Sequence, residues 1–348
     1  MKYFTLTDPE LHVDGLPGFN TDKKLCRLPE SVMALGNDNI RLHGCLPVGG
    51  RVRFRTDSIR YTVQVVWDTL AVDRGMPLIG SAGIDVWEGQ NEDSCATADT
   101  ARFITTLAPP DYHTRQVEVV LDKAEGMRDI MLHLPRNERV AQIIIGIENG
   151  ARIETPLAYT VNPPIIYYGS SITGGGCASR VSNAYTALVN RWLNADYINF
   201  GFSGSARGEK FLAEYFSTLS MSAFVLDYDH NAPTPEELQA THEAFFRVIR
   251  QAQPKLPILI MTRPDFENDW QSDQRRAVIR ATYNHAVQKG DTHVWFLDGE
   301  LFFGRENRHA CTVDGCHPTD LGFMRMAQTV YPVLKEMLQL DCAVRKPF

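Results

Sequence analysis

A serine, a histidine and an aspartate of this chain have the order and spacing that nucleophilic catalysis needs. Ser171 lies in the run YGSSITG at 168–174, and Asp314 and His317 lie in the run DGCHP at 314–318. A hydroxyl nucleophile requires a base that takes its proton and a carboxylate that orients that base. Because three positions separate Asp314 from His317, one short loop can deliver both, so we expect His317 to be the base and Asp314 its partner.

Two further positions could stabilise the negative charge of a tetrahedral intermediate. Gly204 ends the run NFGFSG, and Asn231 ends the run DHN. Such an intermediate needs hydrogen-bond donors aimed at its oxyanion. The backbone N–H groups of Ser171 and Gly204 and the side-chain amide of Asn231 are the expected donors. Each position alone is a weak signal, since turn glycines commonly serve a positive φ and loop asparagines commonly make local turn bonds.

The second half of the chain has the pattern of a parallel sheet covered by helices. Short apolar runs alternate there with helical stripes, which predicts a parallel sheet with helices on both faces. Sites in such sheets lie at the carboxyl ends of the strands, and Ser171, Gly204 and Asn231 each follow a predicted strand. The predicted strands are 165–168, 196–200, 223–227, 257–262 and 293–297.

The first half alternates polar and apolar residues with a period of two, which is typical of antiparallel strands with one buried face. We therefore predict a β-sandwich resembling a jelly roll over residues 1–160, without a helix of three turns before residue 150. A proline-containing stretch at 155–164 is the predicted linker to a second domain at 161–348. The alternating runs are 51–56, 61–67, 117–121 and 130–134.

Side chains on these strands have simple expected roles. Arg51, Arg53 and Arg55 fall on the polar face of their strand and are expected to be solvated, with contact to an anionic substrate as the alternative. Trp67 and Trp87 are expected in the core, with stacking on a sugar ring as the alternative.

Composition bounds the classes of protein to which the chain can belong. The chain has 348 residues, 44% of them hydrophobic and 22% charged, with a net charge of −7. These values are ordinary for a globular protein and argue against a nucleic-acid surface. No run approaches the length of a membrane span, and no signal peptide is recognised. Seven scattered cysteines predict reduced thiols and a cytoplasmic location.

The order Gly-x-Ser, Ser-Gly, Asn and Asp-x-x-His resembles the SGNH/GDSL hydrolase family over about residues 162–342. The resemblance implies a flavodoxin-like α/β domain with Ser171 as nucleophile and His317 as base, oriented by Asp314. It also implies that Gly204 and Asn231 belong to the oxyanion hole.

The sequence departs from this family pattern in two places. Ser170 replaces the usual aspartate before the nucleophile, which makes Ser170 an alternative nucleophile, although the register favours Ser171. The acidic residue that usually follows the asparagine is also absent. The run GIDVW at 83–87 resembles a motif of a subgroup with an N-terminal β-domain, whose members act on small acyl groups, often on carbohydrates.

The resemblance implies a serine esterase that uses an acyl-Ser171 intermediate, with an O-acetylated carbohydrate as substrate. No metal or organic cofactor, nucleic acid or membrane is expected as a partner. The sequence does not specify the oligomeric state, and a homo-oligomer is one of the alternatives. The alternatives are an acyltransferase with the same triad and an inactive carbohydrate-binding protein. A zinc site is a further reading, but its residues lack the usual paired spacing. The candidate metal ligands are His309, Cys311, Cys316 and His317, and, for another cation, Asp227, Asp229 and His230.

Overall fold

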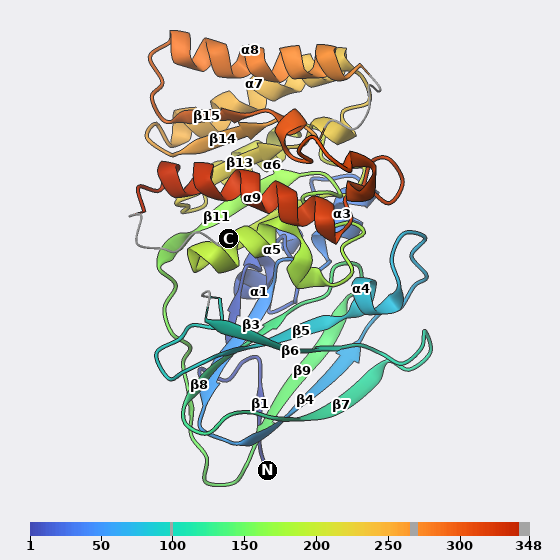
Figure 1. Cartoon of the computed structure of the whole chain (residues 1–348), viewed down its shortest axis with the longest axis vertical. Coiled ribbons are helices and arrows are strands. Elements are labelled where there is room, and N and C mark those ends of the chain that lie inside the picture. The colour runs from blue at the N-terminus through green and yellow to red at the C-terminus, as the bar shows by residue number, and fades with distance from the viewer. Residues whose placement is uncertain (98–99, 265–270, 341–348) are drawn as a thin grey trace.

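The computed structural model describes residues 1–97, 100–264 and 271–340, and Figure 1 shows their arrangement. An antiparallel β-rich half built from the N-terminal part of the chain lies at one end of the long axis. A half with a parallel sheet and most of the long helices lies at the other end. The predicted fold class, an α/β domain preceded by an antiparallel β-domain, is confirmed.

The five-stranded parallel sheet has the strand order β12-β11-β13-β14-β15. In chain order this is 2-1-3-4-5, the flavodoxin-like arrangement. All four neighbouring pairs are parallel. The strands are β11 (Val161–Gly169), β12 (Ala195–Gly201), β13 (Ala223–Asp227), β14 (Ile258–Met261) and β15 (Val294–Leu297).

Helices cover both faces of this sheet because its strands are apolar on both sides. Ile166 and Tyr168 of β11 pack in one core and Ile165 and Tyr167 in a second, since successive side chains point to opposite faces. The first core includes residues of α6, α7 and α8, and the second includes residues of α5 and α9. The helices are α5 (Tyr185–Leu193), α6 (Lys210–Ser217), α7 (Pro235–Ala252), α8 (Ser272–Gln288) and α9 (Asp320–Met337).

The antiparallel half contains two sheets, ordered β1-β9-β4-β7 and β10-β3-β8-β5-β6, with β2 paired to β3. Their inner faces share one hydrophobic core, to which Phe54 of β3 and Val63 of β4 both belong. This is a two-sheet sandwich, whereas jelly-roll connectivity stays a prediction. The strands are β1 (Lys2–Thr5), β2 (His12–Asp14), β3 (Arg51–Thr56), β4 (Arg60–Trp67), β5 (Ile84–Gly89), β6 (Ala101–Leu107), β7 (Gln116–Asp122), β8 (Arg128–His133), β9 (Val140–Ile147) and β10 (Ile153–Glu154).

Four short helices interrupt this half, and none before residue 150 reaches three turns in the described chain, as predicted. The division into domains at 160/161 stays a prediction. The predicted linker at 155–164 is not wholly a linker, because its last residues belong to strand β11. The helices are α1 (Pro17–Asp22), α2 (Glu30–Met33), α3 (Asp38–Gly44) and α4 (Leu78–Ala82).

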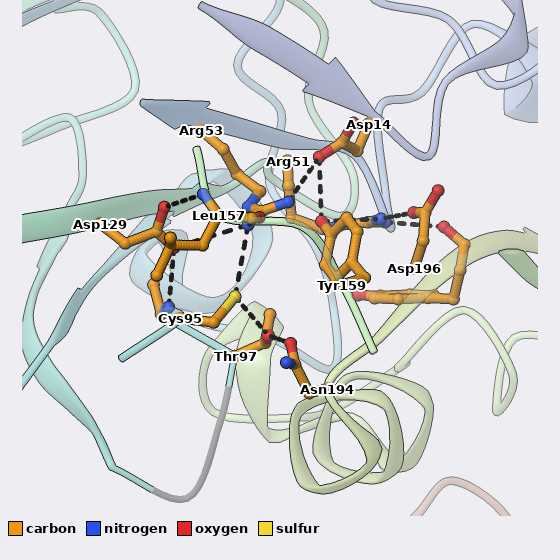
Figure 2. A network of polar contacts seen from close by, with 12 residues as sticks. Asp14, Arg51, Arg53, Cys95, Thr97, Asp129, Leu157, Tyr159, Asn194 and Asp196 are labelled. Carbon is orange, nitrogen blue, oxygen red and sulfur yellow. Dashed lines mark hydrogen bonds and ion pairs between the residues drawn. The ribbon is translucent and has the colours of Figure 1, made fainter. Parts of the chain in front are cut away.

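The prediction that Arg51 and Arg53 are solvated is wrong. They are 1% and 2% exposed, because Arg51 packs against β12, where it donates to the Tyr197 carbonyl at 2.7 Å, and Arg53 packs against the ring of Tyr159. Figure 2 shows their network: Arg51 pairs with Asp196 of β12, and Arg53 pairs with Asp14 and Asp129. Each buried guanidinium therefore has at least one carboxylate partner, as burial of a charge normally requires.

Arg55, on the same face, is half-buried and donates to the carbonyl of Glu92 at 2.7 Å. Trp67 and Trp87 are both buried and belong to hydrophobic cores, as expected.

Candidate active site

Ser171, His317 and Asp314 form a continuous hydrogen-bonded chain. The Oγ atom of Ser171 lies 2.8 Å from Nε2 of His317, and Nδ1 of His317 lies 2.8 Å from Oδ2 of Asp314. Each imidazole nitrogen thus has one partner, so the carboxylate can fix the ring while Nε2 faces the hydroxyl. This is the relative placement that the sequence predicts, and the catalytic roles themselves stay predictions.

Tight backbone packing at the end of β11 presents Ser171. A Cβ atom at Gly169 would collide with Thr173 and with the carbonyl of Asp227, and one at Gly201 would collide with the backbone of Gly174. Glycine is therefore needed where β11 and β12 end. The turn beyond is closed by a hydrogen bond from the Gly176 N–H to the Ser171 carbonyl at 2.8 Å.

The loop before α9 holds the histidine and the aspartate in a fixed relation. The backbone N–H groups of Cys316 and His317 both donate to Oδ1 of Asp314, at 3.0 and 2.8 Å. Partial burial raises the pKa of Asp314, but these bonds and the His317 ring outweigh it, so the pKa lies below its usual value. The carboxylate is thus ionised in neutral solution, as an orienting partner of a base must be.

Gly204 and Asn231 lie beside Ser171. Gly204 has φ = +64° and an added Cβ would have no neighbour within 4 Å, so this residue faces open space. The Nδ2 atom of Asn231 donates to the Phe202 carbonyl at 2.8 Å, which ties the loop after β13 to the loop after β12. The amide carries a second N–H, which this hydrogen bond does not use. The assignment of these groups to an oxyanion hole stays a prediction.

One cleft of about 670 Å³ brings all five predicted site residues together. It also contains residues that sequence reasoning did not select. Arg136 follows β8, and residues 73–76 belong to the loop between β4 and α4, so both come from the antiparallel half. No local pattern marks them, because their role depends on how the two halves meet. The cleft residues are Asp73, Arg74, Gly75, Met76, Arg136, Ser171, Gly176, Cys177, Ser203, Gly204, His230, Asn231, Val313, Asp314, Cys316 and His317.

Two further ionisable groups lie next to the Ser171 site: Asp227 is buried, and His230 is half-buried at the edge of the cleft. Asp227 ends β13 and accepts hydrogen bonds from Thr173 at 2.9 Å and Tyr185 at 2.8 Å. Burial raises its pKa to about 7 despite these bonds. Burial also lowers the pKa of His230 to about 3, so this histidine is neutral at physiological pH.

The proposed zinc ligands do not gather into a metal site. Across residues 1–97, 100–264 and 271–340, no three His, Cys, Asp or Glu side chains are placed to hold a metal ion. His317 uses both ring nitrogens within the Ser171–Asp314 chain. The six cysteines in the described ranges are free thiols, and Cys342 lies outside them.

No helix in the described part of the chain is long and apolar enough to cross a membrane.

A flavodoxin-like sheet with a Ser-His-Asp chain at the carboxyl ends of its strands defines a serine ester hydrolase. The sequence model of the GDSL-like lipase/acylhydrolase family matches residues 162–335, and this chain belongs to that family. Residues 1–153 match the GxDLY domain, the N-terminus of SGNH-hydrolase-type esterases. The GIDVW run at 83–87 lies within this match.

Solved structures share the whole architecture. A candidate GDSL-like lipase from Bacteroides ovatus superposes with a TM-score of 0.85 at 24% identity, covering 98% of each chain. The salicylyl-acyltransferase SsfX3 of a tetracycline biosynthetic pathway gives 0.80 at 20% identity over 99% of each chain. A family two carbohydrate esterase from Clostridium thermocellum gives 0.62 at 14% identity, covering 97% of this chain and 99% of its own. No curated protein matches the chain significantly.

Proposed function

We propose that this protein hydrolyses esters of small acyl groups through a covalent acyl-Ser171 intermediate, and that its substrates are O-acetylated carbohydrates. The pair of 2.8 Å contacts from Ser171 through His317 to Asp314 carries the proposal. A hydroxyl hydrogen-bonded to an imidazole that a carboxylate orients is the arrangement that deprotonation of a serine nucleophile requires.

In acylation, Nε2 of His317 takes the hydroxyl proton while Oγ of Ser171 attacks the ester carbonyl carbon. The carbonyl electron pair moves onto oxygen, where the N–H groups of Ser171 and Gly204 and the Asn231 amide donate to it. The C–O bond to the alcohol then breaks, and the alcohol leaves with the proton from His317. In deacylation, His317 activates a water that attacks acyl-Ser171, which releases the carboxylic acid and restores the serine.

The lining of the cleft supports a small acyl group on a polar alcohol. Most side chains around the cleft are charged or polar, with Met76 and Val313 among the few apolar ones. Sugar hydroxyls can hydrogen-bond to such groups, whereas a long acyl chain would need an extended apolar channel. Carbohydrate esterases from Clostridium thermocellum and Butyrivibrio proteoclasticus, the second an acetyl xylan esterase, share the fold.

An acyltransferase with the same triad is the second candidate, because the fold also matches a salicylyl-acyltransferase with a TM-score of 0.80. Solvent access favours hydrolysis: the side chain of His317 is 29% exposed and that of Asp314 is 50% exposed. Water can therefore reach the base after acylation. Partition of the acyl group between water and added sugar alcohols, followed by mass spectrometry, separates the two reactions.

The first experiment is hydrolysis of p-nitrophenyl acetate, butyrate and octanoate by wild type, Ser171→Ala and Ser217→Ala. Ser217 is a control because it lies on α6, and its hydroxyl, the group that the substitution removes, donates to the Glu214 carbonyl of the same helix. We expect Ser171→Ala to lose activity while Ser217→Ala keeps it, with acetate the best substrate. Acetylated xylose and cellobiose are then assayed by acetate release. Wild-type turnover by Ser171→Ala, or octanoate as the best ester, would contradict the proposal.

A further inference from the structure

Arg136 extends from the antiparallel half into the candidate active site and joins two loops there. Its Nε donates to the Gly174 carbonyl at 3.1 Å, and its Nη2 lies 3.4 Å from the Ser171 carbonyl. The same Nη2 lies 3.0 Å from Oγ of Ser203. One planar guanidinium therefore connects the loop that carries Ser171 to the loop that carries Gly204.

These two loops hold the backbone N–H groups expected to face the oxyanion. Ser203 directly precedes Gly204, and Gly174 lies in the turn that follows Ser171. The relative position of the two N–H groups depends on the spacing between the loops. A guanidinium presents its donors in a rigid fork, so Arg136 can set that spacing, whereas a single flexible ammonium cannot reproduce all three contacts.

The charge of Arg136 is buried without a carboxylate partner. Arg136 is 9% exposed, and among the described residues no carboxylate oxygen lies within ion-pair distance of its guanidinium; Asp73 acts on its charge only at longer range, with Asn137 between them. Arg51, which also joins the two halves, and the neighbouring Arg53 are each paired with aspartates (Figure 2). Burial lowers the pKa of Arg136, yet an arginine keeps its proton in proteins. A buried charge without a direct ion pair costs free energy, which its hydrogen bonds to the two loops offset.

A second arginine of the antiparallel half binds the end of β12, which leads into the loop that carries Gly204. Arg27 is 1% exposed, donates to the carbonyls of Asn199 at 3.0 Å and Gly201 at 2.7 Å, and stacks 4.9 Å from the ring centre of Phe202. Arg27 likewise has carbonyl oxygens as its hydrogen-bond acceptors. Two cations thus lie against the Gly201–Gly204 segment, where an anion would form during acyl transfer.

We propose that Arg136 is a positioning residue for the reaction, which aligns the N–H groups of Ser171 and Gly204 and whose positive charge, held without a direct ion pair, favours the oxyanion. The inference rests on the proposed function and deepens it. It also gives the antiparallel half a direct role, since that half supplies the residue that completes the site.

The neighbourhood of Arg136 is built to hold it in place. Asn137 accepts a hydrogen bond from its Nη1 and donates from Nδ2 to Asp73 at 2.6 Å, so the loop at 73–76 supports the guanidinium indirectly. A Cβ at Gly176 would lie 3.0 Å from Nη2 of Arg136 and 3.2 Å from Cδ2 of His317. The side chains of Arg136 and His317 therefore lie on either side of Gly176, and a larger residue at this position would press on both of them.

The test compares Arg136→Gln, Arg136→Lys and Arg136→Ala with the control Arg139→Gln. Arg139 lies three positions along the same loop, pairs with Asp68 and is 44% exposed, outside the cleft. We expect Arg136→Gln to lower kcat for p-nitrophenyl acetate by about 10–100-fold, with KM changed by less than about threefold. Arg136→Lys should recover only part of kcat, and Arg139→Gln should match wild type.

Three measurements separate positioning from folding. Thermal unfolding reports whether each variant is folded at the assay temperature, and Arg136→Ala is assayed with added methylguanidinium, which should restore activity in a saturable manner. The rate of labelling by a fluorophosphonate, whose phosphonyl oxygen occupies the oxyanion position, should fall with kcat. The inference is overturned if a folded Arg136→Gln protein has the kcat of wild type. It is also overturned if the variants lose activity only in proportion to their unfolded fraction and methylguanidinium does not restore the activity of Arg136→Ala.

The same assays distinguish failure of this inference from failure of the proposed function. If Ser171→Ala is inactive while Arg136→Gln behaves as wild type, only the role of Arg136 is wrong. If Ser171→Ala keeps full activity, the proposed function itself is wrong.

Discussion

The carboxylate of Asp85 accepts a hydrogen bond from the backbone N–H of Ser182 at 3.0 Å, which joins β5 of the antiparallel half to the parallel-sheet half. Asp85 is fully buried and also accepts from Oγ1 of Thr106 at 2.6 Å. Ser182 belongs to the short 3₁₀ helix η1 (Val181–Asn183), which precedes α5 and follows the Ser171 loop. The aspartate of the GIDVW run therefore anchors one half of the molecule to the segment beyond the nucleophile.

Replacement of Asp85 should weaken this junction. Asp85→Ala leaves the Ser182 N–H buried without its acceptor, so we expect the free energy of unfolding to fall by about 1–3 kcal/mol. Asp122→Asn is the control, because that exposed carboxylate pairs with Arg60 on the surface and should contribute less than about 1 kcal/mol. Urea unfolding followed by intrinsic fluorescence measures both. If the two substitutions lower the free energy of unfolding equally, the Asp85 junction stabilises the protein no more than a surface ion pair does.

Ser170 and Ser171 should differ sharply when replaced. Ser170 is 1% exposed and its Oγ accepts from the Ile172 N–H at 3.1 Å, so it supports the turn and does not face the cleft. We expect Ser170→Ala to keep activity within about tenfold of wild type, since only a local turn bond is lost. Steady-state hydrolysis of p-nitrophenyl acetate and intact-mass detection of the fluorophosphonate adduct decide this, and an adduct on Ser170 would reverse the assignment.

Asp314→Asn should separate orientation of the base from folding. An asparagine can place an N–H toward Nδ1 of His317 and so favour the tautomer that cannot accept the Ser171 proton. We expect kcat to fall by about 10²–10⁴-fold, with the midpoint of thermal unfolding little changed because Asp314 is half exposed. Full activity of a folded Asp314→Asn protein would remove this aspartate from the mechanism.

Asp227 should make stability depend on pH. Its pKa is about 7 in the fold, above the roughly 3.9 of an unfolded chain, so between these values only the folded protein retains the proton. The contribution of Asp227 to the free energy of unfolding is therefore fully present below the unfolded pKa and is lost as the pH rises towards 7. Asp227→Asn cannot ionise and should remove this loss.

The measurement is urea unfolding of wild type and Asp227→Asn at pH 5 and pH 8. We expect the wild-type free energy of unfolding to decrease relative to the variant by on the order of 2 kcal/mol over that interval. Parallel pH profiles for the two proteins would mean that Asp227 is ionised in the fold throughout.

Much of the secondary structure followed from local pattern. The strand predicted at 223–227 is β13 with the same bounds, and the alternating run at 51–56 is β3. These strand predictions are confirmed because the spacing of apolar residues along a strand reflects whether one or both of its faces are buried. Helix α6 was not predicted, since it spans only eight residues, and such a short helix carries little periodic signal.

The sequence by itself determined which residues are candidates for the chemistry, because the serine, glycine, asparagine and Asp-x-x-His blocks occur together in the order of a known family, although each block alone is a weak signal. Only the tertiary structure decided what surrounds them. Arg51 and Arg53 look solvated in an alternating strand but are buried, and Arg136 carries no local signal yet touches the Ser171 loop. Their environments come from contacts between segments far apart in the chain, and a local pattern cannot specify which face meets another half of the molecule.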